Sequence, residues 1–209
     1  YLHRQASEHG RQAVGVLPGA YPREVLWALD LLPVEIWGPP QATPAESRLR
    51  VPAYVCGPVR HALQFAQAGG LRGLAGLVVP HTCDSLQGLR SLLGDLAPLG
   101  IPVLAYDQPH APRAGAAEAA WRAGVVAFRA RELARFISAC EQVGGTRLDE
   151  GRLARTIDAH EGALELARRL QREGGGQRLG ERRAMELLRS GEYLHLDDWT
   201  AALASAVAE

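Results

Sequence analysis

Lysine and asparagine are absent from this 209-residue chain, which has one methionine and three cysteines. The 23 basic residues are therefore all arginines, and they balance 23 acidic residues to a net charge of zero. Because a neutral chain offers no basic field to a polyanion, the composition disfavours nucleic acids and anionic membranes as partners. The absence of lysine matches the codon bias of a GC-rich genome, and we assign no mechanism to it.

Long hydrophobic runs are also missing. No uncharged apolar run approaches the ~20 residues that a membrane span requires, which predicts a soluble protein. The three cysteines are odd in number and irregularly spaced, and the chain shows no secretory signal. We therefore expect reduced thiols in the cytoplasm and not a disulfide framework.

Two familiar catalytic motifs do not occur. The sequence contains no Gly-x-Ser-x-Gly elbow, and its glycine-rich residues 69–73 precede an apolar run, where the dinucleotide fingerprint must follow one. The two acidic pairs are Glu24 with Glu35 and Asp197 with Asp198. We expect these carboxylates to cap helices or face solvent, and not to perform acid–base catalysis.

Short apolar runs alternate with helical patterns through the first half of the chain. The apolar runs cover residues 13–17, 34–37, 74–79 and 101–106, and the helical patterns cover residues 22–31, 58–68 and 84–96. Runs without polar alternation are typical of parallel strands covered on both faces, and strand–helix–strand order gives right-handed crossovers. We therefore predict an α/β fold with a small doubly wound parallel sheet of about four strands, flavodoxin-like or Rossmann-like.

Only helical patterns follow this region. They cover residues 114–143 and 149–173 and a tail, residues 179–209, that breaks at Ser190 and Gly191. The change of pattern divides the chain into an α/β domain, residues 1–112, that carries Cys56 and Cys83, and a helical segment, residues 113–209.

Two cysteines stand immediately before predicted helices. Cys83 follows an apolar run and precedes Asp84, and Cys56 precedes Gly57 and Pro58. The carboxyl edge of a parallel sheet is where α/β proteins place ligands, and helix N-termini favour a thiolate. The two thiols are therefore predicted to converge as part of a site for a soft metal or an iron–sulfur cluster, or to act as nucleophiles.

Other interpretations of these side chains stay open. Free cysteine often packs as a small buried hydrophobe, and Cys140, within an apolar helical stripe, is expected to do so. A Cys2His2 zinc site made with His61 and His81 is conceivable, although the spacing matches no compact zinc pattern. His110 follows the fourth apolar run, so we expect it either to line a ligand pocket or to be solvated.

The motif Val78-Val79-Pro80-His81-Thr82-Cys83-Asp84-Ser85-Leu86-Gln87, with Tyr54-Val55-Cys56 and Pro22-x-Glu24, resembles the 2-hydroxyacyl-CoA dehydratase family and the related benzoyl-CoA reductase subunits. The resemblance covers residues 11–172 and is most specific around Cys83. It implies a 4Fe-4S cluster with Cys56 and Cys83 as the first two ligands, beside an acyl-CoA thioester.

In that family an ATP-dependent activator protein delivers one low-potential electron through the cluster to the thioester, for reductive dehydration or ring reduction. The resemblance therefore implies an acyl-CoA substrate, the activator and a homologous partner subunit. On the ground of adjacency to Cys83, we expect His81, Ser85 and Gln87 to be catalytic groups on the substrate side or behind the cluster ligands.

The chain departs from the family at the third cluster cysteine, because Cys140 does not match it. An N-terminal piece of a longer subunit, a half-length relative that borrows the third ligand, and a relative without a cluster all fit this departure. A cluster-free binding or assembly module is therefore the alternative to the enzyme, and a zinc-dependent hydrolase is a third possibility.

Overall fold

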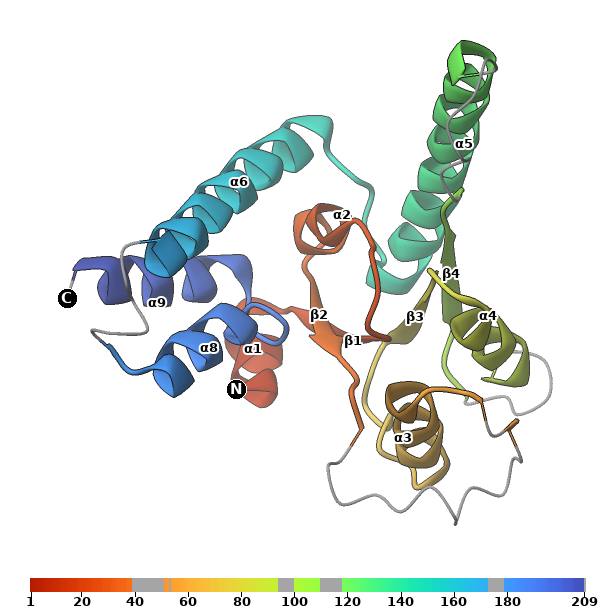
Figure 1. The fold of residues 1–209 in the computed structure, drawn as a ribbon, viewed down its shortest axis with the longest axis horizontal. Coiled ribbons are helices and arrows are strands. Elements are labelled where there is room, and N and C mark those ends of the chain that lie inside the picture. The colour runs from red at the N-terminus through yellow and green to blue at the C-terminus, as the bar shows by residue number, and fades with distance from the viewer. Residues whose placement is uncertain (39–50, 53, 94–99, 110–117, 173–178, 209) are drawn as a thin grey trace. The chain divides into compact units, whose positions relative to one another are not determined.

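The computed structural model describes the chain except residues 39–50, 53, 94–99, 110–117, 173–178 and 209 (Figure 1). Most of the loop that follows Gly38 therefore lies outside the described residues, and so does His110. The elements in chain order are α1 (Leu2–His9), β1 (Gln12–Val16), α2 (Arg23–Ala28), β2 (Leu31–Glu35), α3 (Gly57–Gln67), β3 (Gly76–His81), α4 (Asp84–Ser91), β4 (Val103–Asp107), α5 (Glu118–Gly144), α6 (Glu150–Arg172), α8 (Glu181–Ser190) and α9 (Leu196–Ala208).

The four strands form one sheet in the order β2-β1-β3-β4. β1 runs parallel to β3 with Val14 opposite Gly76, and β3 runs parallel to β4 with Leu77 opposite Val103. Helices follow the strands, and the helical segment from α5 onward contains no strand among its described residues. The predicted small α/β fold followed by a helical segment is confirmed.

The predicted elements differ from the observed ones mainly at their ends. Leu31, which we assigned to the end of a helical pattern, begins β2 together with Leu32, and both side chains are buried in the sheet. Helix α1 was not predicted at all. Its one buried residue is Gln5, whose amide donates to Asp198 at 3.0 Å and accepts from Arg11 at 2.7 Å. A helix held by polar contacts has no apolar stripe for a sequence pattern to reveal.

The chain divides into two compact units that interleave along the sequence. The first unit comprises residues 1–13, 22–35 and 146–209, and the second comprises residues 14–21 and 36–145. The domain division at residue 112, expected from the change of sequence pattern, stays a prediction.

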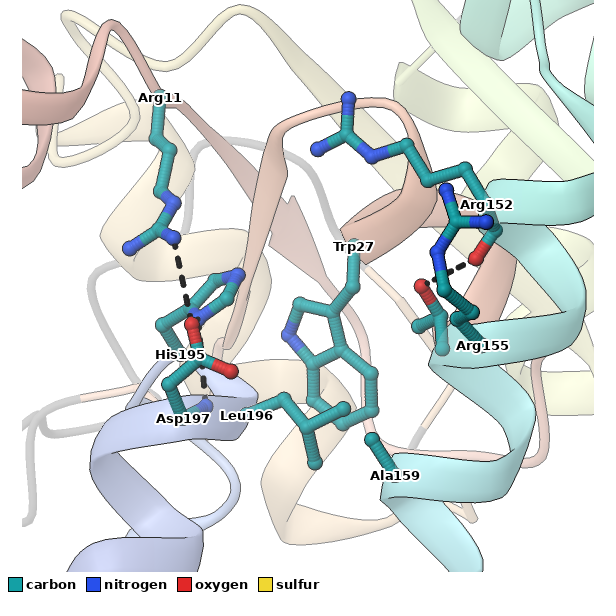
Figure 2. A pocket seen from close by; sticks show the side chains of 9 residues that line it. Arg11, Trp27, Arg152, Arg155, Ala159, His195, Leu196 and Asp197 are labelled. Atoms are coloured by element: carbon teal, nitrogen blue, oxygen red, sulfur yellow. Dashed lines mark hydrogen bonds and ion pairs between the residues drawn. The ribbon is translucent and has the colours of Figure 1, made fainter.

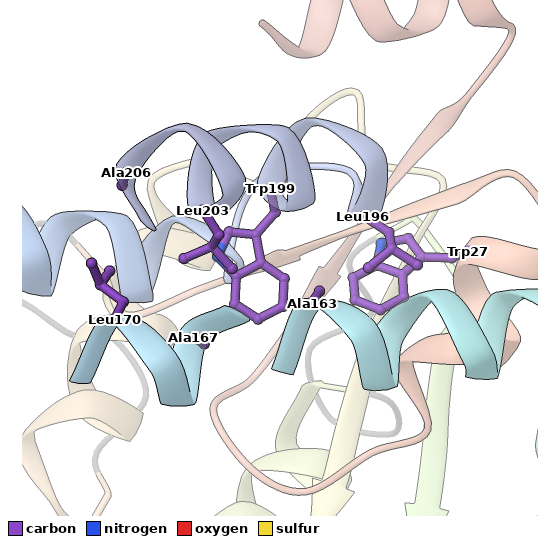
Figure 3. Close-up of a cluster of buried hydrophobic side chains, with 8 residues drawn as sticks. All are labelled: Trp27, Ala163, Ala167, Leu170, Leu196, Trp199, Leu203 and Ala206. Carbon is purple, nitrogen blue, oxygen red and sulfur yellow. The ribbon is translucent and has the colours of Figure 1, made fainter. Parts of the chain in front are cut away.

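The core of the first unit is a cluster of tryptophan, leucine and alanine side chains between α6, α9 and α2 (Figure 3). Its members are Trp27, Ala163, Ala167, Leu170, Leu196, Trp199, Leu203 and Ala206. The alanines of α6 let α9 approach closely, and Trp199 donates its indole N–H to the carbonyl of Leu187 at 3.1 Å.

One acidic residue of the first unit differs from the expectation that these carboxylates cap helices or face solvent. Glu35 is only 7% exposed and pairs with Arg23, so the expectation was wrong for Glu35. Glu24 stands in the first turn of α2, and its carboxylate also lies 2.6 Å from Nδ1 of His160.

The second unit buries its long helix against the last strand. α5 contacts β4, and Phe136 of α5 is fully buried with its ring 5.3 Å from that of Tyr106. Cys140, one turn further along, is also fully buried, which confirms its predicted place in the core. No helix within the described ranges is long and apolar enough to cross a membrane.

Candidate functional site

A cavity of about 220 Å³ lies within the second unit. Its walls come from the segments that follow β1 and β3 and from the first turns of α3 and α4. The lining residues are Leu17, Pro18, Trp37, Cys56, Pro58, Val59, Ala62, Thr82, Cys83 and Leu86. Most of these side chains are apolar, so the two thiols and the Thr82 hydroxyl are its main polar features.

The cavity sits where the order of the strands reverses. β1 has β2 on one side and β3 on the other, so the connections from β1 and β3 leave the sheet in opposite directions. Leu17 directly follows β1, and Thr82 directly follows β3. In open α/β sheets the carboxyl ends of the strands at such a reversal are the usual place for a ligand.

Cys56 occupies the residue immediately before α3. Its backbone is extended, its carbonyl accepts the Arg60 N–H at 3.2 Å, and Pro58 stands in the first turn, where its missing N–H costs nothing. The thiol itself makes no capping hydrogen bond, and the residue is exposed. The sulfur therefore remains available to a ligand.

Cys83 occupies the same position before α4. Its carbonyl accepts the N–H groups of Leu86 and Gln87, each at 3.1 Å, while its side chain makes no capping bond and is exposed. The first N–H groups of a helix have no acceptor within the helix and favour negative charge. Two thiols at two helix N-termini thus line one cavity, as the sequence predicted.

The donor set suits a soft metal or an iron–sulfur cluster in kind but is incomplete in number. Thiolates are the preferred ligands of iron–sulfur clusters, which take up to four of them. Cys140 is no candidate for a third ligand at this cavity, because it is fully buried in α5 and does not line the cavity. Within the described residues, no three His, Cys, Asp or Glu side chains gather as a metal site.

That finding also bears on the zinc alternative. Cys56, His61, His81 and Cys83 are all described, and they do not assemble into such a group. The part of the chain that the structure describes therefore gives no geometric support to a Cys2His2 zinc site.

His81 is not among the residues that line the cavity. Its Nδ1 lies 2.7 Å from Asp107 Oδ1, directly across the β3–β4 pair. The same carboxylate oxygen accepts the Gln108 N–H at 2.8 Å, and the Gln108 amide donates to the carbonyl of Ala20 at 2.7 Å. This network links the end of β4 to the segment after β1.

Ser85 and Gln87 both lie on α4, close to Cys83 in sequence. Ser85 is half-buried in the first turn, whereas Gln87 is exposed, and neither lines the cavity. Their predicted catalytic roles, like that of His81, remain predictions. Sequence reasoning missed Thr82 and Trp37 as cavity walls, although Thr82 adjoins Cys83 and was within the motif we quoted.

A glycine brings Trp37 to the cavity. Gly38 has a φ of +77°, and a Cβ at this position would lie 2.7 Å from the carbonyl carbon of His61 in α3. Only glycine accepts both that backbone conformation and that approach. The segment after β2 is thereby packed directly on α3, the helix that begins at Cys56.

Comparisons with known proteins show the family of the chain. A family model described as the 2-hydroxyglutaryl-CoA dehydratase D-component matches residues 19–209. The chain is 30% identical over 83 residues to lactoyl-CoA dehydratase subunit beta from Anaerotignum propionicum, covering 40% of the chain and 22% of that protein. It is 30% identical over 78 residues to (R)-2-hydroxyglutaryl-CoA dehydratase subunit beta from Acidaminococcus fermentans, covering 37% and 21%.

A third relative is the (R)-phenyllactyl-CoA dehydratase beta subunit from Clostridium sporogenes, 28% identical over 87 residues, which are 42% of the chain and 23% of the relative. Each match thus spans about a fifth of the length of the relative.

Proposed function

This chain belongs to the 2-hydroxyglutaryl-CoA dehydratase D-component family, and from that membership we propose that it is a dehydratase component that binds a 2-hydroxyacyl-CoA thioester beside Cys56 and Cys83. The observation that carries the proposal is that both thiols line one cavity at the strand-order reversal. The reaction class is a reductive dehydration, with ring reduction as the related possibility.

A 4Fe-4S cluster is the cofactor that we propose for these thiols. Such a cluster supplies low-potential one-electron transfer to a thioester carbonyl. Cys56 and Cys83 would be ligands of this cluster, since both are exposed and neither side chain makes a helix-capping hydrogen bond. Both also stand at helix N-termini, which favour anionic sulfur. A further ligand has to come from another segment or subunit, because Cys140 is buried in α5.

The apolar wall of the cavity has a separate task. Leu17, Val59 and Leu86 are buried, and Trp37 also lines the cavity. Apolar walls exclude water from the reacting carbonyl and strengthen hydrogen bonds and charges inside the site. We propose that this wall also accepts the acyl chain of the substrate.

His81, Ser85 and Gln87 remain the proposed catalytic groups. With Nδ1 of His81 bonded to Asp107, the hydrogen sits on Nδ1 and any proton exchange with a substrate uses Nε2. Ser85 and Gln87 are proposed to donate hydrogen bonds toward the thioester or the cluster sulfurs. These roles rest on adjacency to Cys83.

The partners follow from the family. The relatives are named as subunits of dehydratases, and we propose that this chain likewise works with a homologous subunit and an ATP-dependent activator protein, in the cytoplasm. The alternative is a cluster-free binding or assembly module. It is favoured by one observation, that the described part of the chain supplies two thiols and no third metal ligand to the cavity.

The acyl-CoA part of the proposal is tested by protection of the thiols. Lactoyl-CoA, the substrate named for one relative, should slow the alkylation of Cys83 by iodoacetamide in a saturable way, and free CoA should protect less. Replacing Trp37 with alanine should weaken the protection, while Val126→Ala, on the exposed face of α5, should leave it unchanged. Equal alkylation rates with and without lactoyl-CoA would contradict acyl-CoA binding at this cavity.

A further inference from the structure

A second cavity, of about 250 Å³, lies entirely within the first unit. Figure 2 shows Arg11 on one side, Arg152 and Arg155 of α6 on the other, and the indole of Trp27 between them. The floor is apolar, formed by residues such as Ala159 and Leu196. Nothing in the proposed dehydratase chemistry uses this cavity.

Two buried donors at this cavity have no acceptor. The indole Nε1 of Trp27 and the Nε of Arg11 are both inaccessible to solvent and make no hydrogen bond. Trp27 is only 2% exposed, and Figure 2 shows its nitrogen on the side of the ring that faces His195. Buried N–H groups are nearly always satisfied in native proteins, so each unsatisfied one calls for an explanation. An acceptor atom supplied by a ligand is such an explanation.

A contact with the ring of His160 holds the indole of Trp27 in this orientation. The ring of His160 packs edge-on against it with 5.1 Å between centroids, and His160 Nδ1 lies 2.6 Å from the Glu24 carboxylate. The donor of Trp27 is therefore fixed and does not need to be reoriented when a ligand arrives. Preorganised donors bind anions better than mobile ones do.

The arginines differ in how firmly carboxylates already hold them. Arg152 donates to both oxygens of Asp30, at 2.8 and 2.6 Å, so its charge is already neutralised by a carboxylate. Arg155 lies 3.9 Å from an oxygen of Asp149, with both side chains at least 70% exposed. An exposed ion pair of that length is weak and yields to a better acceptor.

Arg11 is likewise only loosely neutralised. One of its terminal nitrogens donates to the neutral amide of Gln5 at 2.7 Å, and another lies 3.5 Å from Asp197, which is 75% exposed. Arg11 and Arg155 thus bring positive charge to the cavity that no buried carboxylate cancels.

His195 adds a neutral polar group to the same wall. Burial, and then the charge of Arg11, lower its pKa, so the ring is neutral near pH 7. Its Nδ1 lies 3.3 Å from the backbone nitrogen of Asp197 and 3.2 Å from the carboxylate of the same residue. The negative charge beside this wall is the Asp197 carboxylate, which is 75% exposed.

We propose that this cavity binds the oxyanion of a small ligand, a carboxylate or a phosphate, through Trp27 and Arg11, with an apolar part of the ligand on Leu196 and with Arg155 adding its positive charge from the other side of the indole. Oxyanions satisfy several N–H donors at once, and arginine is the residue best shaped to hold them. The volume admits a small organic acid or phosphate ester and excludes a whole nucleotide cofactor.

The test is nuclear magnetic resonance of the tryptophan indoles in the full chain. The chain has four tryptophans, and the signal that Trp27→Phe removes identifies Trp27. Inorganic phosphate and acetate are each titrated at constant ionic strength against chloride. Arg155→Gln is compared with Arg168→Gln, a control on the same helix whose partner is Glu165 and which does not line the cavity.

We expect a saturable shift of the Trp27 indole signal with phosphate or acetate, and the tighter anion identifies the class of ligand. Arg155→Gln should weaken that binding by about two- to fivefold through loss of an exposed positive charge, and Arg168→Gln should leave it unchanged. The proposal fails if neither anion produces a saturable shift, or if both arginine variants respond alike. The experiment involves no cluster and no thioester, so its failure leaves the proposed function untouched.

Discussion

Cys56 and Cys83 hold equivalent positions in two successive strand–helix units, each as the residue before the first turn of its helix, and both line the same cavity. Parallel strands bring the starts of their following helices to one edge of the sheet. The pairing of the two thiols is therefore a consequence of topology, and it gives the proposed cluster site its location.

The three cysteines should differ sharply in reactivity. Iodoacetamide at pH 8 should modify Cys56 and Cys83, which are exposed, and spare Cys140, which is fully buried with a pKa of about 12. Mass spectrometry of peptides from the native protein measures the three rates. In denaturant all three should react, and labelling of native Cys140 as fast as Cys56 would contradict the described packing of α5.

Replacing Gly38 with alanine should destabilise the second unit. A left-handed conformation costs a non-glycine residue about 1–2 kcal/mol, and the new Cβ would also meet the backbone of His61. Gly57→Ala, at the start of α3 with open space around it, is the matched control and should change stability little. Urea unfolding of both variants measures the free energies, and equal midpoints would show that Gly38 is not under this constraint.

The contact of α5 with β4 predicts a large effect of Phe136→Ala. Phe136 is fully buried against Tyr106, and truncating a buried phenylalanine costs about 3–5 kcal/mol. Val126→Ala, on the same helix but 68% exposed, should lie within about 0.5 kcal/mol of the wild type. Denaturant unfolding distinguishes them, and a loss below about 1 kcal/mol for Phe136→Ala would mean that α5 does not pack as described.

The Asp30–Arg152 pair predicts a pH-dependent contribution to stability. Hydrogen bonds from Arg152, and then its charge, lower the pKa of Asp30 below 3.8. A lowered pKa means that the stabilisation is present at neutral pH and is lost as the pH falls below 3.8 through the folded-state value. Asp30→Asn should therefore lower Tm at pH 7, by an amount that shrinks in acid.

Asparagine is the suitable replacement because Asp30 has a φ of 58°, which asparagine tolerates. Asp158→Asn, at an exposed position of α6, should shift Tm little at any pH. If the gap between wild type and Asp30→Asn stays constant down to pH 2.5, the effect comes from packing and not from the ion pair.

The sequence was informative where burial produces a local pattern, such as a continuous apolar run. The apolar runs of β1, β3 and β4 and the glycines after α5 marked these elements to within a few residues. The positions of Cys56 and Cys83 before helices followed from the same patterns. Such features are local, so they can be recognised without knowing what packs against them.

What the sequence did not reveal depends on contacts between distant segments. α1 is held by Gln5 and its polar partners, so it carries no apolar stripe. The oxyanion cavity joins Arg11 and Trp27 to α6 and α9, more than a hundred residues away. No sequence pattern within a single segment could have predicted either feature.

The most direct test of the proposed site is the iron and acid-labile sulfide content of the full chain after anaerobic reconstitution, with electron paramagnetic resonance of the reduced sample. We predict iron and sulfide in equal amounts in the wild type and in Cys140→Ala, and their loss, with the protein still folded, in Cys56→Ser and Cys83→Ser. A wild type that binds no iron, or a Cys56→Ser/Cys83→Ser double variant that binds as much as the wild type, would contradict the account.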